Sequence, residues 1–193
     1  MSNAYFTSPL TFLISTLFTL YILVLLLRFL LQLTHADFYN PLSQFIVKAT
    51  SPVLRPLRRV IPGWGGIDIA SLVAILVLQL VSVWLVLLLT HRPVGLGGLL
   101  LIAVAQLVDL VFSVYIWGIV ILAVLSWVNP GVYNPMTSVL GSLTEPLLRP
   151  VRRVLPPMGG FDLSPLVVIL GLQVLRMLVM PLFGYTGRTL FGL

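Results

Sequence analysis

The stretch YNPLSQFIVKATSPVLRPLRRVIPGWGGID, residues 39–68, recurs 94 positions later as YNPMTSVLGSLTEPLLRPVRRVLPPMGGFD, residues 133–162. Over residues 39–72, 16 of 34 positions are identical to the residue 94 further on, without a gap. Two membrane loops could share Arg and Leu through composition alone, but not Pro, Gly and Asp in one register over this length. The chain therefore contains an internal duplication, and the duplication sets its architecture.

Long apolar stretches flank both copies. The residues AVILMFWYC make up 59% of the chain and DEKR only 8%, against about 25% charged residues in average globular domains, which excludes an ordinary soluble domain. Because about 20 apolar residues span the hydrocarbon layer, we expect membrane-spanning helices at about residues 9–34, 67–90, 99–128 and 162–182. Residues 1–93 then form a first repeat around an interfacial segment at about 41–62, and residues 94–193 a second around 135–156.

The predicted fold is an all-α integral membrane protein with four transmembrane helices, arranged as two tandem parallel helix-loop-helix repeats in one bundle. The two long loops carry seven basic residues, whereas the opposite ends of the spans carry two, Arg92 and Arg188. The positive-inside rule places both long loops in the cytoplasm and both termini outside.

Each repeated segment begins with a helix-start pattern, Asn40-Pro41 and Asn134-Pro135, in which Asn caps the helix and Pro occupies its first turn. Two further prolines inside each segment lack backbone donors, so we expect a broken or kinked helix. On a helical wheel, Leu and Val cluster opposite the arginines, which is typical of a helix lying in the membrane interface.

The arginines of these segments are candidate lipid-binding or partner-binding residues: Arg55, Arg58, Arg59, Arg149, Arg152 and Arg153. They act as topological anchors, as ligands for a phosphate-bearing partner (lipid headgroup, nucleic acid or phosphorylated metabolite), or as a docking surface for an acidic protein. We expect anionic lipid headgroups, and a membrane protein or a second copy of the chain, as partners. We do not expect nucleic acid.

Each segment ends in a repeated Pro, Gly and Asp pattern: Pro62, Gly66 and Asp68, then Pro156, Gly160 and Asp162. The aspartates stand just before a span, so they cap the entering helix or form a salt bridge with an arginine of the same repeat. The glycine pair lacks the lysine of a phosphate-binding loop, so a nucleotide site is rejected.

Three charges interrupt the spans, Arg28, Asp109 and Arg176. Arg28 lies about 9 Å from the cytoplasmic end of its span, so we expect it to snorkel into the interface. Asp109 and Arg176 both lie in the outer half and are expected to pair. None of the three recurs 94 positions away, which argues against an ion path built symmetrically by both repeats.

The sequence offers little for catalysis or for cofactor binding. It has no Cys, two His on opposite sides of the predicted membrane, and five carboxylate side chains spread along the chain. We therefore expect no catalytic site, no metal site and no cofactor, and we expect a protein that is not an enzyme.

The motif YNPxSxFxxKxTxPxLxPLRRxIPxxGxID, with its degenerate second copy, resembles the signature of the YggT family of bacterial and plastid membrane proteins over essentially the whole chain. The resemblance implies a multi-pass protein of the bacterial inner membrane. It also implies links to osmotic tolerance and ion homeostasis, to cell division or nucleoid distribution, or to haem handling in plastid cytochrome assembly, and it brings no catalytic residue.

We accordingly expect a non-enzymatic scaffold or assembly factor at the cytoplasmic face, linked to envelope or osmotic-stress homeostasis. The alternatives are an ion-handling component, for example in potassium-related adaptation, and a membrane factor associated with cell division or the nucleoid.

Overall fold

The computed structural model describes residues 2–128, 134–155 and 162–184. In chain order these residues form α1 (Ser2–Leu33), α2 (Pro41–Val60), α3 (Ile69–Leu89), α4 (Leu96–Val128), α5 (Pro135–Val154), α6 (Ser164–Val179) and the 3₁₀ turn η1 (Met180–Phe183). By length and composition four stretches are able to cross a membrane: Ser8–Leu33, Ile69–Leu89, Leu96–Ser126 and Ser164–Phe183. The predicted all-α membrane fold with two tandem repeats is confirmed.

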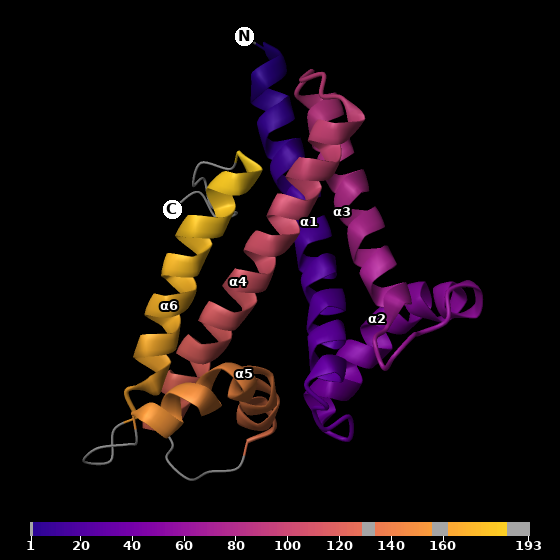
Figure 1. Ribbon diagram of the computed structural model, residues 1–193. Coiled ribbons are helices and arrows are strands. Elements are labelled where there is room, and N and C mark those ends of the chain that lie inside the picture. The colour runs from indigo at the N-terminus through magenta and orange to yellow at the C-terminus, as the bar shows by residue number, and fades with distance from the viewer. Residues whose placement is uncertain (1, 129–133, 156–161, 185–193) are drawn as a thin grey trace.

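The two amphipathic helices, α2 and α5, lie at the same end of the molecule, away from the start of α1 and the turn between α3 and α4 (Figure 1). Both begin as the sequence predicts. The side chain of Asn40 accepts a hydrogen bond from the backbone N–H of Leu42 at 2.9 Å, and Asn134 accepts one from Met136 at 3.0 Å. Each cap is followed by a proline in the first turn, where its missing donor costs nothing.

Of the break or kink expected at the internal prolines, the break is absent. Helix α2 runs continuously through Pro52 and Pro56, and α5 runs through Pro146 and Pro150. All four prolines are exposed, and so is Lys48, whose carbonyl loses its donor at Pro52. The other carbonyls that lose a donor belong to Pro52 and Pro146, which are exposed, and to Ser142, which is half-buried. Solvent and headgroups can therefore satisfy most of them, and the helix tolerates the prolines.

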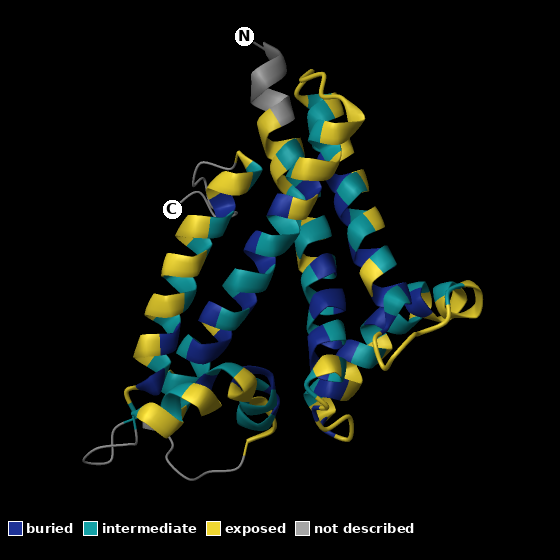
Figure 2. Ribbon diagram, viewed as in Figure 1, coloured by how far each residue is buried: buried dark blue, intermediate teal, exposed yellow. Residues whose placement is uncertain are grey.

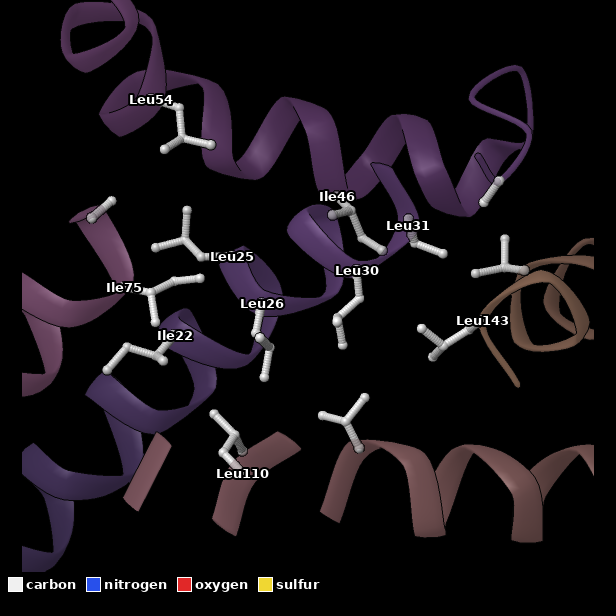
Figure 3. Close-up of a cluster of buried hydrophobic side chains, with 14 residues drawn as sticks. Ile22, Leu25, Leu26, Leu30, Leu31, Ile46, Leu54, Ile75, Leu110 and Leu143 are labelled. Atoms are coloured by element: carbon white, nitrogen blue, oxygen red, sulfur yellow. The ribbon is translucent and has the colours of Figure 1, made fainter. Parts of the chain in front are cut away.

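The main buried cluster joins both repeats (Figure 3). Helix α1 supplies Ile22 and Leu25, both fully buried, and α4 and α5 contribute Leu110 and Leu143 to the same cluster. A smaller cluster around Ile119, Leu148 and Val168 lies within the second repeat. Since lipid tails are themselves apolar, such contacts stabilise the bundle through close packing.

The outward faces of the spans are apolar and exposed, most extensively along α6 (Figure 2). Leu170 and Leu178 on α6 are 58% and 66% exposed, and Leu17 on α1 is 65% exposed. So many exposed leucines along the spans indicate that these surfaces contact lipid.

Candidate functional site

An ion pair in each repeat ties the amphipathic helix to the start of the next span. Arg58 of α2 donates to Asp68, which also accepts from the hydroxyl of Ser71 and, at 3.4 Å, from its backbone N–H. In the second repeat Arg152 Nε donates to Asp162 Oδ2 at 2.9 Å. Asp162 also accepts from the backbone N–H of Ser164 at 2.9 Å. Both roles expected for these aspartates therefore apply. Each accepts from a backbone N–H at the start of a helix, and each pairs with an arginine of its own repeat.

Both carboxylates of these Arg–Asp clamps are held in the charged form. Burial raises the pKa of Asp68, but the hydrogen bonds from Arg58 and Ser71 outweigh burial and keep the pKa below its ordinary value. Burial likewise raises the pKa of Asp162, and the hydrogen bonds from Ser164 and Arg152 lower it below the ordinary value. The clamps are thus fully formed at neutral pH.

The clamps divide the six candidate arginines into two groups. Arg58 and Arg152 hold the helices in place, and Arg152 has a second ion pair with Glu145 at 2.8 Å. The other four are exposed and make no ion pair with any described residue: Arg55, Arg59, Arg149 and Arg153. These four are the arginines able to bind a ligand outside the chain.

The two amphipathic helices contact one another. Asn40, at the start of α2, is almost fully buried, and its side-chain N–H donates to the backbone carbonyl of Pro135 at 2.7 Å. Leu143 of α5 reaches the main cluster formed around α1. The basic helices of the two repeats are therefore neighbours as well as being at the same end of the bundle.

The turn after α2 explains part of the repeated Pro-Gly-Asp pattern. Trp64 and Ile67 exchange backbone hydrogen bonds across the turn, and Gly65 and Gly66 adopt φ of 60° and 81°. Two successive positive φ values favour glycine, because it has no Cβ to clash. Pro62 lies exposed just before this turn. Pro156 and Gly160, the equivalents in the second repeat, lie outside the described residues.

The expectation that Arg28 snorkels into the interface is wrong. Its side chain is only 8% exposed, and its Nη1 donates to Thr50 Oγ1 at 2.6 Å and to the carbonyl of Val47 at 3.1 Å. Helix α2 crosses α1 at this level, so oxygens of α2 accept the hydrogen bonds from Nη1. Thr50 was missed from the sequence, although its identity with Thr144 in the second repeat was an available signal.

A basic groove of about 1280 Å³ lies between α1 and α2. Its lining includes four cationic side chains, Arg28, Lys48, Arg55 and Arg58, and no carboxylate. Aromatic side chains, among them Phe45, line it as well. Sequence analysis named Arg55 and Arg58 as candidate lipid-binding or partner-binding residues, but it counted Lys48 only among the basic residues of its loop and treated Arg28 separately. The crossing of α1 and α2, which brings the four together, cannot be read from one helix.

The predicted pairing of Asp109 with Arg176 is confirmed. Arg176 Nε lies 2.7 Å and Nη2 2.6 Å from Asp109 Oδ1, and the aspartate is 2% exposed. Asp109 Oδ2 is buried without a hydrogen-bond partner among the described residues. A neighbouring polar link, Gln79 to Gln106 at 2.5 Å, joins α3 to α4 and was not predicted.

Every carboxylate side chain of the chain accepts a hydrogen bond within the described residues: Asp37, Asp68, Asp109, Glu145 and Asp162. Across the same ranges, no three His, Asp or Glu side chains are grouped as metal ligands. Four of these carboxylates thus serve helix starts and ion pairs, and Asp37 accepts from the backbone N–H of Tyr39 in the loop before α2.

Comparison with known proteins agrees with the duplicated architecture. A family model described as CCB3/YggT matches the chain twice, at residues 7–89 and 101–183. "Uncharacterized protein PA0392" of Pseudomonas aeruginosa is 49% identical over 172 residues, or 87% of this chain and 86% of the relative. "Uncharacterized protein YggT" of Escherichia coli strain K12 is 45% identical over 184 residues, 95% of both chains. No solved structure matches. The chain belongs to the CCB3/YggT family, with one family unit in each repeat.

Proposed function

We propose that this protein is a non-enzymatic membrane scaffold or assembly factor that presents α2 and α5 as one basic platform, consisting of Arg55, Arg59, Arg149 and Arg153. The observation that carries the proposal is the contact between the two amphipathic helices at one end of the bundle. Each helix also keeps two exposed arginines that have no ion pair among the described residues.

The chemistry of the platform favours anionic headgroups and acidic faces of membrane proteins. A basic residue near an anionic leaflet contributes about 1 kcal/mol, so the two exposed arginines of each helix contribute about 2 kcal/mol. Guanidinium also binds phosphate and carboxylate in a bidentate manner. The Arg58–Asp68 and Arg152–Asp162 clamps support this role, because they tie the end of each amphipathic helix to the next span and so fix where its arginines lie.

The proposed location is the bacterial inner membrane, with the platform in the cytoplasm and both termini outside, as the seven-to-two division of basic residues favours. Alkaline phosphatase fused to either terminus should then be active, and a fluorescent protein fused there should be dark. We further propose that the scaffold serves envelope or osmotic-stress homeostasis, in keeping with the family resemblance.

The platform is tested by purification in native lipid, using polymer-extracted membrane discs. The variant Arg55→Gln/Arg59→Gln/Arg149→Gln/Arg153→Gln removes the charge of the platform and leaves both clamps intact. We expect the wild type, and the control Arg92→Gln at the opposite end, to retain the same membrane partner and enriched anionic lipid, and the quadruple variant to lose both. Equal recovery by the quadruple variant would contradict the proposal.

An ion-handling role is the second candidate. The observation that favours it is the buried Asp109, which has one carboxylate oxygen without a hydrogen-bond partner among the described residues. Against it, the positions 94 away from Asp109 and Arg176 are Ser15 and Ser82, so the second repeat does not mirror the first. Potassium flux in liposomes that contain only this protein, abolished by Asp109→Asn, would favour this role over the scaffold.

A further inference from the structure

The groove between α1 and α2 holds positive charge without a matching negative charge. Arg28 is buried, and its three hydrogen bonds, all from Nη1, go to neutral oxygens of Val47, Thr50 and Ser51. The neighbouring acid, Asp68, is already paired with another cation of the groove. A buried guanidinium whose partners are all neutral is costly, so this groove favours an anion.

The depth and the lining of the groove describe the anion further. Arg28 lies five residues before the end of α1, about 8 Å along the helix, so it is inside the span but close to the end where the headgroups begin. Phe38 and Phe45, 43% and 64% exposed, line the same groove as the cations. A volume of about 1280 Å³ is larger than a phosphate ion requires. The groove suits a molecule with a phosphate at one end and an apolar tail at the other.

The second repeat lacks these charges. At the positions 94 residues on, Leu122 replaces Arg28 and Ser142 replaces Lys48, while Glu145 stands where the first repeat has Ser51. The arginines shared by both repeats are retained. Duplication and topology account for the shared arginines, but they do not account for two extra cations that converge on one groove in the first repeat.

We propose that the groove binds one anionic phospholipid. Its phosphate lies among Arg28, Lys48 and Arg55, and its acyl chains lie along Phe38 and Phe45. The proposal rests on the proposed function, because Arg55 belongs both to the groove and to the platform. It names the class of ligand that the first-repeat part of the platform binds. The two proposals differ in stoichiometry. The groove binds one lipid molecule, whereas the exposed arginines of the platform attract a diffuse layer of lipids.

The test is native mass spectrometry of the detergent-purified full chain, titrated with phosphatidylglycerol, phosphatidylcholine or inorganic phosphate. We expect the wild type to retain one phosphatidylglycerol per chain at concentrations where phosphatidylcholine is not retained. Lys48→Gln/Arg55→Gln changes two exposed side chains and should weaken binding on the order of 30-fold. Arg59→Gln/Arg149→Gln/Arg153→Gln keeps every residue of the groove and should remain within about twofold of the wild type.

Arg28→Gln provides an independent arm, and it too should weaken phosphatidylglycerol binding while the thermal transition stays cooperative. Unchanged lipid retention in Lys48→Gln/Arg55→Gln would overturn the proposal, and so would displacement of the lipid by inorganic phosphate. An equal loss in the three-arginine control would show a diffuse layer, in which case the platform stands and the groove fails. If the groove retains phosphatidylglycerol but the platform arginines prove dispensable in cells, only the proposed function fails and the groove stands.

Discussion

Asn40 at the start of α2 donates a side-chain hydrogen bond to the backbone carbonyl of Pro135 at the start of α5, at 2.7 Å. The same Asn40 side chain accepts from the backbone N–H of Leu42. One amide group thus caps the basic helix of the first repeat and holds the basic helix of the second beside it. The two basic helices are therefore joined at the residues that begin them.

Changing Asn40→Asp should destabilise the protein by about 1–2 kcal/mol, because aspartate still caps α2 but cannot donate to Pro135. The control is Asn134→Asp, the equivalent residue, which caps α5 and is exposed. Both changes add a negative charge at a helix start, so their difference reports the lost link to Pro135 together with the cost of burying a carboxylate at position 40. Equal free energies of unfolding for the two variants, measured in mixed micelles, would show that the link contributes nothing.

The Asp109–Arg176 pair predicts strongly non-additive mutations. Asp109→Ala leaves a partly buried guanidinium without its carboxylate and should cost about 3 kcal/mol of unfolding free energy. Adding Arg176→Leu should recover part of this loss, since an absent pair costs less than an unpaired charge. The double-mutant cycle is completed by Arg176→Leu alone. Strictly additive effects would mean that the two side chains do not interact.

The clamp at Asp68 predicts a defined pH dependence. Because the pKa of Asp68 is lowered in the folded protein, its contribution to stability is present above the unfolded pKa of about 3.9 and is lost as pH falls through the folded pKa. Asp68→Asn keeps a helix cap and removes the charge. Since Arg58 is 39% exposed and screened by solvent, we expect a deficit of only about 1 kcal/mol at pH 7.

That deficit should shrink as pH falls from about 5 through the lowered folded-state pKa of Asp68, where the wild-type carboxyl becomes neutral like the amide. Unfolding free energies of the wild type and of Asp68→Asn across this range provide the measurement. A deficit of the same size at every pH would exclude the charged clamp as its source.

The sequence predicted the features that repeat or that follow chain depth. The spans follow from apolar length, the caps at Asn40 and Asn134 from the Asn-Pro pattern, and the pairing of Asp109 with Arg176 from their similar depths. The aspartates at 68 and 162 were narrowed to two physical roles, and the structure shows both.

Features that depend on how the helices cross could not be predicted from the sequence. The depth of Arg28 would allow its side chain to reach the interface. Only the position of α2 determines that the side chain donates to Thr50 instead. The prolines were expected to break or kink each helix. That the helices continue through them depends on the exposure of the prolines, which is a tertiary property. The hydrogen bond from Asn40 to Pro135 likewise depends on how the two repeats pack together.

The central claim is that the four exposed arginines carry the activity, and complementation in a strain lacking the gene tests it most directly. Arg55→Gln/Arg59→Gln/Arg149→Gln/Arg153→Gln should insert with normal topology, because Lys48 and the clamp arginines remain. We predict that it fails to restore growth under osmotic stress, while the matched lysine variant Arg55→Lys/Arg59→Lys/Arg149→Lys/Arg153→Lys, which keeps the charge, restores at least part of it. Full growth of the glutamine variant at wild-type protein levels would contradict the account and leave these arginines as topological anchors only.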